Sequence, residues 1–324
     1  MSPTPNIPLT SPRLPVVYLK LVLTAACWGG VFHAGRYAVH LMSPLAAGAW
    51  RFTLAALIFM PLVAWREGWA LAAIKRNALV LGIMSAVGVF GFNIGMFFGL
   101  KSTSAVNGAL IVAVTPALTA VLAALLNRRA PSVMQVIGLA LGMAGVAMVV
   151  SHGSLDVLLS LQLSQGDAWV LLAAFCWAIY SVLPQRFIKG LSSLQVAGST
   201  IIGGAVLMIG FGAKAAPDLL QVPPMGAMLG IVFMAVFGSV LAYMWWNDGI
   251  QVIGPAQAAI FMNFVPLFAA LIGVLLGEHL AASQLLGAAL VIGGVLSSTV
   301  LNKARPASQQ VEKGQGAEGV PKAA

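Results

Sequence analysis

The chain has 324 residues, of which 60% are hydrophobic and only 8% are charged. A water-soluble domain carries about a quarter of its residues as charged side chains, so this composition excludes a soluble protein and predicts an integral membrane protein. The net charge of +9 comes from basic residues in short loops and tails, so we expect no nucleic-acid partner. The two cysteines, Cys27 and Cys176, lie in apolar stretches, and we expect no disulfide framework, metal site or other cofactor.

Ten apolar runs follow one another along the chain, each near the roughly 20 residues that a helix needs to cross a bilayer. We therefore predict an all-α integral membrane protein with ten transmembrane helices. The predicted spans are 17–35, 45–65, 78–99, 103–126, 133–151, 167–187, 194–212, 226–247, 255–276 and 283–301. The Pro-rich head, residues 1–16, and the polar tail, residues 302–324, hold too few apolar residues to fold and are predicted to be disordered.

The distribution of basic residues predicts the orientation. An even number of spans places both termini on the same side, and 13 of the 17 Lys and Arg residues fall on that side. The other four are Arg36, Arg51, Lys101 and Lys214. Because loops rich in Lys and Arg stay in the cytoplasm, we expect both termini to be cytoplasmic.

The two halves of the chain resemble each other at a register of 149 to 150 residues. Trp28 matches Trp177 and Pro116 matches Pro266 in this register. A further match joins Gln135, Gly138, Leu141, Gly145 and Val146 to Gln284, Gly287, Leu290, Gly294 and Val295. The first five predicted helices therefore resemble the last five.

The repeat predicts two five-helix domains, at residues 17–151 and 167–301. Five is an odd number, so the second domain enters the membrane from the opposite side and the halves form an inverted repeat. Carriers built in this way hold their solute near the bilayer midplane, between the halves. The inversion favours alternating access, because exchanging the conformations of the two halves turns a cavity from one side of the membrane to the other.

An ordered set of short motifs recurs in both halves. The set is Trp28-Gly29, Thr115-Pro116 and Gly145-Val146 in the first half, and Val265-Pro266, Leu276-Gly277-Glu278 and Gly293-Gly294-Val295 in the second. Over residues 18–301 it resembles the EamA family of the drug/metabolite transporter superfamily, and within that family most resembles the YddG-like exporters of aromatic and other neutral amino acids. The resemblance implies a central cavity between the repeats, export as the direction of transport, and a bacterial inner membrane.

Three prolines inside predicted spans are candidate hinges or kinks. Pro116 and Pro266 lie mid-helix at equivalent positions, and each leaves the carbonyl four residues earlier without its usual donor. Pro184 does the same in the sixth span. The alternative for the matched pair is simple inheritance from the repeat.

Polar and aromatic side chains inside the spans are candidates to bind the solute, because a polar group in hydrocarbon is costly without a partner or water. The candidates are His33, Asn93, Trp177, Tyr180, Tyr243, Trp246 and Asn263. Asn93 and Tyr243 occupy equivalent positions in the repeats. The alternative is an interhelical hydrogen bond for each Asn, packing or interfacial anchoring for each Trp, and a structural role for His33.

The positions of the charged residues predict the coupling and the substrate. Every Asp and Glu falls at a span end, in a loop or in the tail, so we expect facilitated diffusion, with proton-coupled efflux through His33 as the alternative. Arg51 and Lys101 lie near predicted span ends, which leaves no buried cation for a strongly anionic solute. We expect a neutral or zwitterionic solute whose ring or alkyl part contacts the aromatic side chains. Aromatic amino acids, other neutral amino acids and lipophilic cations all fit.

Three other classes of function are considered. An intramembrane enzyme would show a nucleophilic serine with a histidine, or paired aspartates, and the sequence shows neither, so we expect no catalytic residues. A channel would show a recurrent ring of like polar groups. A structural or receptor role would leave the protein unable to move any solute. We expect a monomer in contact with the lipid bilayer and a small-molecule substrate.

Overall fold

The computed structural model describes residues 14–100, 102, 105–128, 130–160, 164–277 and 282–299. Each described element is helical. The tail at 302–324, predicted to be disordered, lies outside the described residues, and so does the predicted disordered head apart from residues 14–16, which begin the first helix.

The helices of the first half follow one another along the chain. They are α1 (Leu14–Leu41), α2 (Pro44–Arg66), α3 (Leu71–Arg76), α4 (Ala78–Met84), the π-helix η1 (Ser85–Gly91), α5 (Phe92–Leu100), α6 (Ala105–Val112), α7 (Thr115–Asn127) and α8 (Val133–Val150). A short helix, α9 (Leu155–Leu159), comes before the second half.

The second half repeats this order without a counterpart of α3. Its helices are α10 (Gln165–Phe187), α11 (Ser193–Ala215), α12 (Met225–Phe233), the π-helix η2 (Met234–Leu241), α13 (Ala242–Ile253), α14 (Pro255–Ala259), the 3₁₀-helix η3 (Ile260–Asn263), α15 (Phe264–Leu275) and α16 (Ala282–Thr299).

The described helices are long and apolar enough for a protein that crosses a membrane many times. Among the described residues, nine continuous helical stretches satisfy the length and composition of a span, and a shorter apolar helix covers Ala282–Ser298. The first and eighth stretches run further than predicted, to Leu14–Leu41 and Met225–Ile253. Asp248, in the extended part of the eighth stretch, pairs with Lys20 of the first, with 2.6 Å between Nζ and Oδ2.

Serine caps fix where several helices begin. Ser132, Ser164 and Ser192 each accept the backbone N–H three residues later, and the side chain at that third position bonds back to the backbone of the serine. This reciprocal pair satisfies two backbone donors that a helix start otherwise leaves open.

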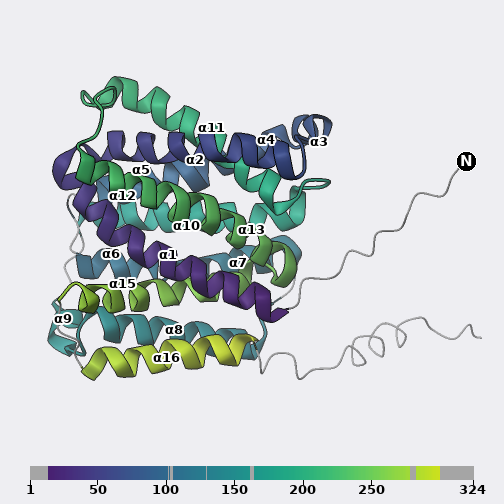
Figure 1. Cartoon of the computed structure of the whole chain (residues 1–324). Coiled ribbons are helices and arrows are strands. Elements are labelled where there is room, and N and C mark those ends of the chain that lie inside the picture. Colours follow the sequence, from purple (N-terminus) through teal and green to yellow (C-terminus); the bar gives the residue numbers. More distant parts are fainter. Residues whose placement is uncertain are drawn as a thin grey trace, which may run out of the picture.

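Each half contributes its first helix to the packing of the other half. Helix α1 packs mainly against α12, α13 and α15 of the second half, and α10 packs mainly against α5, α6 and α7 of the first. Figure 1 shows α1 crossing the bundle between these helices. The two halves therefore interlock, and the space between them is lined by both.

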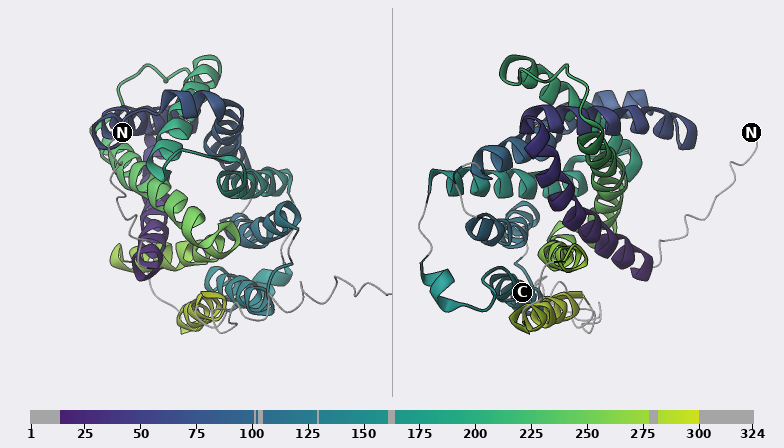
Figure 2. Two further views of the ribbon diagram at one scale, coloured as in Figure 1. Left: turned by 90° about the vertical axis from the view of Figure 1, so that its right-hand side faces the viewer. Right: turned by 60° about the vertical axis from the view of Figure 1, so that its left-hand side comes forward.

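Helices α8 and α16 form a separate layer at one edge of the bundle (Figures 1 and 2). They touch backbone to backbone: a Cβ added at Gly138 would lie 2.6 Å from the Gly294 carbonyl oxygen, and one at Gly145 would lie 2.6 Å from that of Gly287. Small residues permit such close approach inside a membrane. As the residue number rises along α8 it falls along α16, so the two helices run antiparallel.

The π-helices η1 and η2 sit in the third and eighth spans at equivalent positions of the repeat. The sequence did not predict them. A π-helix inside an α-helix is rare and occurs often at functional sites. Here the two segments lie against the first helices of the two halves, since η1 packs on α10 and η2 packs on α1.

Candidate functional site

An aromatic cluster lies where the two halves interlock, with Trp177 of α10 at its centre. Five rings lie with their centroids 5.2–5.7 Å from that of Trp177, and they are Trp28, Phe92, Tyr180, Tyr243 and Trp246. They come from α1, α5, α10 and α13. Trp28 and Trp177, which are equivalent in the repeat, meet edge to face at 85°.

The sequence predicted four members of this cluster, Trp177, Tyr180, Tyr243 and Trp246, and the structure brings all four together. Their exposed fractions are 2%, 0%, 2% and 1%. Trp28, which sequence reasoning used only as a repeat marker, is half-buried. Phe92 is half-buried too, so these two rings are the less buried members of the cluster.

Most polar atoms of the clustered side chains have hydrogen-bond partners on neighbouring helices. Asn247 donates through Nδ2 to the Tyr180 hydroxyl at 2.8 Å, and the Trp246 indole donates to Ser181 Oγ at 3.3 Å. Asn93 donates to the Val89 carbonyl at 2.6 Å and also hydrogen-bonds the Tyr243 hydroxyl. The predicted pair of Asn93 and Tyr243 is thus in direct contact.

Two glycine carbonyls at equivalent positions accept hydrogen bonds from the cluster. In η1 the Gly88 carbonyl accepts from the Tyr243 hydroxyl at 3.3 Å. In η2 the Gly238 carbonyl accepts from the Trp28 indole at 3.1 Å and from Arg51 Nη2 at 3.2 Å. Each π-helix thus presents a backbone acceptor to side chains of other helices.

Arg51 belongs to the site, and the prediction that it lies near a span end, away from a buried site, is wrong. It lies about 10 Å into α2 at 1.5 Å per residue, and its long side chain reaches further, to the middle of the eighth span. There Nε donates to Ser239 Oγ at 2.9 Å, and the guanidinium carbon lies 4.8 Å from the Phe52 ring centroid. The guanidinium also lies close enough to Tyr243 to interact with it electrostatically. Counting residues from a helix end misses the reach of the side chain.

A buried arginine inside a membrane span is unfavourable unless something compensates for its charge. Insertion scales put the penalty at roughly 2.5–3.5 kcal/mol at a helix centre. Two hydrogen bonds to Gly238 and Ser239 offset part of it. No ion pair to Arg51 occurs among the described residues, where the recorded salt bridge joins Lys20 to Asp248.

Two buried side chains near the cluster have polar atoms without a partner. Trp177 Nε1 is a donor and Asn247 Oδ1 an acceptor, and neither has a hydrogen-bond partner among the described residues. The equivalent indole of Trp28 is bonded to Gly238, so the two tryptophans differ in this respect. Unsatisfied buried groups call for an explanation, and a bound solute is one.

Two predicted site residues lie outside the aromatic cluster. His33 Nε2 lies 2.8 Å from the Ala269 carbonyl in α15, so this nitrogen carries the proton. Asn263 is 1% exposed, and neither of its side-chain polar atoms has a partner among the described residues. It packs on α8, where a Cβ added at Gly142 would lie 2.1 Å from Asn263 Nδ2.

The candidate hinge prolines lie at different kinds of position. Pro116 is in the first turn of α7, just after a break at residues 113–114. Pro266 follows the 3₁₀-helix η3. Both helices are therefore interrupted within one turn before the proline, whereas Pro184 lies in the last turn of the uninterrupted α10.

Asp248, which the sequence places at a span end, lies five residues before the end of the helical stretch Met225–Ile253. It lies inside α13 and pairs with Lys20 of α1, and the two side chains are 26% and 32% exposed. The charges neutralise each other, which lets both remain within helices. Asp248 lies one turn beyond the aromatic cluster, toward the end of the bundle at which α1 begins.

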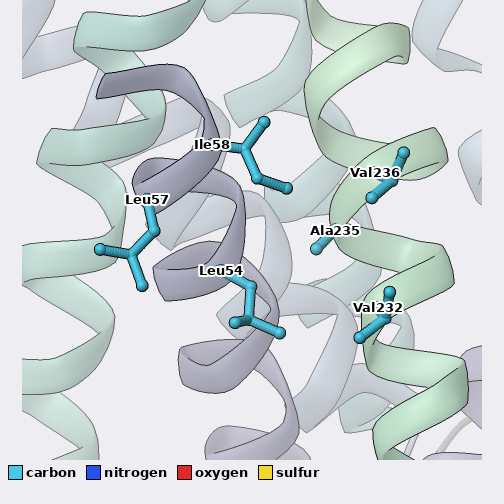
Figure 3. A pocket seen from close by; sticks show the side chains of 6 residues that line it. All are labelled: Leu54, Leu57, Ile58, Val232, Ala235 and Val236. Carbon is cyan, nitrogen blue, oxygen red and sulfur yellow. The ribbon is translucent and has the colours of Figure 1, made fainter. Parts of the chain in front are cut away.

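One pocket lies on the outside of α2, against α12 and η2. Its volume is about 250 Å³, and it is lined by six apolar residues, Leu54, Leu57, Ile58, Val232, Ala235 and Val236. Figure 3 shows Leu54 and Ile58 on the side of α2 that faces Val232 and Ala235. No lining side chain can hydrogen-bond, so this pocket does not suit a polar solute.

The helices and the buried polar site define a multi-pass helical membrane protein of the transport class. The chain belongs to the EamA-like transporter family, whose model matches residues 16–151 and again residues 164–300. The family has thus been matched once in each half. Membership also argues against an enzyme, because the family is one of transporters.

Relatives carry the names of transporters. The uncharacterized transporter YyaM of Bacillus subtilis is 37% identical over 286 residues, covering 87% of this chain and 93% of that protein. The uncharacterized inner membrane transporter YicL of Salmonella typhimurium is 24% identical, covering 86% and 93%. A solved crystal structure superposes with a TM-score of 0.75 at 18% identity, over 89% of this chain and 98% of its own, which shows the same fold.

Proposed function

We propose that the protein is an alternating-access carrier that exports small neutral or zwitterionic metabolites, aromatic amino acids among them, by facilitated diffusion. The observation that carries the proposal is the aromatic cluster around Trp177, which joins helices of both halves and includes polar atoms without partners. Trp28, Trp177, Tyr180, Tyr243, Trp246 and Asn93 form the solute site in this proposal. A YddG-like substrate range fits these residues.

The carrier has ten membrane helices in two inverted repeats around a central cavity. The antiparallel contacts of α8 with α16 support the inversion. Gly138 and Gly287 are equivalent in the repeat, as are Gly145 and Gly294. The contact of Gly138 with Gly294 is therefore matched by that of Gly287 with Gly145, as expected for a two-fold axis lying in the membrane plane. The tenth span is the helix at Ala282–Ser298.

The protein resides in a bacterial inner membrane as a monomer, with both termini in the cytoplasm. The excess of Lys and Arg on the terminal side supports the orientation, and the bacterial relatives named inner membrane transporters support the location. Pro116 and Pro266 act as hinges, which the helix breaks just before them support.

Proton coupling is the alternative mechanism. Among the described residues, Asp248 is already paired with Lys20, Asp167 bonds back to the backbone of Ser164, and His33 Nε2 donates to the Ala269 carbonyl. Protonation of Asp248 would remove the charge that pairs with Lys20, which favours facilitated diffusion. Solute uptake driven by an imposed pH gradient alone would contradict this part of the proposal.

A counterflow assay with purified protein in liposomes tests the function. Vesicles loaded with unlabelled amino acids, nucleosides or drugs take up the labelled form of the same solute if the protein is a carrier, and a saturating rate distinguishes a carrier from a channel. We expect Trp28→Ala to lower this flux at least tenfold. Trp65→Ala is the matched control, since Trp65 is 83% exposed. Absence of counterflow with every solute would overturn the proposed function.

A further inference from the structure

Arg51 and Trp28 lie together at a less buried part of the aromatic cluster. Both side chains are half-buried, whereas Trp177 and Tyr243 are each only 2% exposed. Both also donate to one atom, the Gly238 carbonyl oxygen in η2. A solute that reaches the cluster therefore meets a cation and an indole face side by side.

The charge of Arg51 has no counter-ion in the described part of the protein. The acidic residues there are held elsewhere: Asp248 pairs with Lys20, Asp218 with Ser43, Glu67 with Ser192, and Asp167 with the start of α10. Asp156 lies in the short helix α9, outside the bundle. A guanidinium placed between two helices of a membrane protein without a carboxylate is expected to bind an anion.

The geometry leaves part of the guanidinium available. An arginine has five N–H donors, and the described contacts use Nε, toward Ser239, and Nη2, toward Gly238. The remaining donors lie in a planar fork that matches the oxygens of a carboxylate or a phosphate, and a carboxylate is the one that small apolar metabolites such as amino acids carry. The nearby Gly238 carbonyl and Ser239 hydroxyl hold this fork in one orientation.

We propose that Arg51 binds the carboxylate of the transported solute and so selects for apolar carboxylates, amino acids included, whose side chain packs on Trp28. This inference rests on the proposed transport function and narrows its substrate class, because amines, amides and lipophilic cations that lack a carboxylate are disfavoured.

The second half of the protein has no arginine at the position equivalent to Arg51, which supports a single anion site in each molecule. Thr200 of α11 is equivalent to Arg51 in the repeat. It is fully buried, and its hydroxyl donates to the Val196 carbonyl at 2.9 Å. Only one half therefore offers a cation at this position, and a solute with one carboxylate matches one site.

Pairs of solutes that differ only in the carboxyl group test the inference on the unmodified protein. Phenylalanine and phenylalaninamide, leucine and leucinamide, and benzoate and benzamide are compared as competitors in the counterflow assay. We expect the acid of each transported pair to compete at concentrations at least tenfold lower than the amide. Amides that compete as well as the acids would overturn the inference while leaving the carrier function in place.

Substitutions assign the preference to Arg51. Arg51→Gln removes the charge and should abolish the difference between acid and amide, mainly through a higher KM for the acid, whereas Arg51→Lys should retain part of it. Arg186→Gln is the matched control, because Arg186 is exposed at the end of α10. An acid preference that survives in folded Arg51→Gln, judged by a monodisperse elution profile, would overturn the assignment. If Arg51→Gln does not fold, Arg51→Lys takes its place. A partly retained acid preference in Arg51→Lys supports the assignment, and an acid preference equal to that of the wild type overturns the need for a guanidinium fork. Wild-type protein that moves no solute of either kind would instead overturn the proposed function.

Discussion

The two halves of the protein use the same backbone positions to hold different chemistry. The carbonyls of Gly88 and Gly238 occupy equivalent sites in η1 and η2, yet Gly88 accepts from a tyrosine hydroxyl and Gly238 from an indole and a guanidinium. The repeat thus preserves an acceptor in each half, and in both cases the donors come from the opposite half. The difference teaches that the two halves share a helical framework while the side chains that bond to it differ.

The ends of the first helices show the same contrast. Lys20 of α1 pairs with Asp248 of α13. The equivalent residues of the other half are Trp169 and Phe98, whose ring centroids lie 5.5 Å apart. An ion pair in one half of the repeat register therefore corresponds to an aromatic contact in the other.

The packing of α8 on α16 is where the halves are most alike, and disturbing it should have the largest effect. In Gly294→Ala the new methyl group would lie 2.6 Å from the Gly138 carbonyl oxygen, so the helices must move apart. We expect a loss of about 1–3 kcal/mol of stability, seen as a lower apparent melting temperature in detergent.

The neighbouring residue supplies the control for this change. A Cβ added at Gly293 meets nothing within 4 Å, so Gly293→Ala should leave stability unchanged or raise it, because alanine favours a helix. Gly145→Ala, the repeat equivalent of Gly294→Ala, should lose a similar amount of stability. Markedly unequal losses in Gly145→Ala and Gly294→Ala would argue against a two-fold relation between these helices.

The ion pair of Lys20 and Asp248 should have an intermediate effect. Because both side chains are about a quarter to a third exposed, the pair contributes about 1 kcal/mol or less, and Asp248→Asn should change the exchange rate by no more than about fivefold. The reversed pair, with Lys20→Asp and Asp248→Lys together, should recover most of the wild-type rate. A reversed pair slower than either single variant would show that the contact is not an interaction of opposite charges.

The sequence predicted the framework of the fold well because bilayer physics leaves few alternatives. Apolar runs of about 20 residues located the helices, and the repeat register paired Trp28 with Trp177. The aromatic members of the site were predicted because large aromatic and polar groups inside apolar spans are conspicuous.

Other features of the site have no signal of this kind in a single sequence. The π-helices η1 and η2 depend on hydrogen-bond register, which residue types in these stretches do not specify. The role of Arg51 depends on the reach of a long side chain across a helix interface. His33 and Asn263 looked like members of the cluster from the sequence, but they face α15 and α8, because the rotation of each helix about its axis is set by packing partners that one sequence does not reveal.

The serine caps at the starts of α2 and α11 give the prediction with the smallest expected effect. Ser43, at the start of α2, is held by the Asp218 carboxylate through its backbone N–H and its hydroxyl. The equivalent Ser192, at the start of α11, is held by Glu67. Burial tends to raise the pKa of Asp218, but the hydrogen bonds from Ser43 and from the backbone of Asp218 itself outweigh it and lower the pKa below the ordinary value of 3.8.

A lowered pKa in the folded state means that Asp218 stabilises the fold fully above pH 3.8, and that this contribution disappears as the pH falls through the lowered value. Between pH 6 and pH 3 the melting temperature of the wild type should fall slightly. Asp218→Asn should remove the part of this fall that Asp218 causes, and should lower the free energy of unfolding by about 0.5 kcal/mol at neutral pH. Glu67→Gln leaves Asp218 in place and should retain the Asp218-dependent fall. If Asp218→Asn keeps the wild-type dependence on pH, the carboxylate does not stabilise the Ser43 cap, and the correspondence between the two caps is one of sequence position alone.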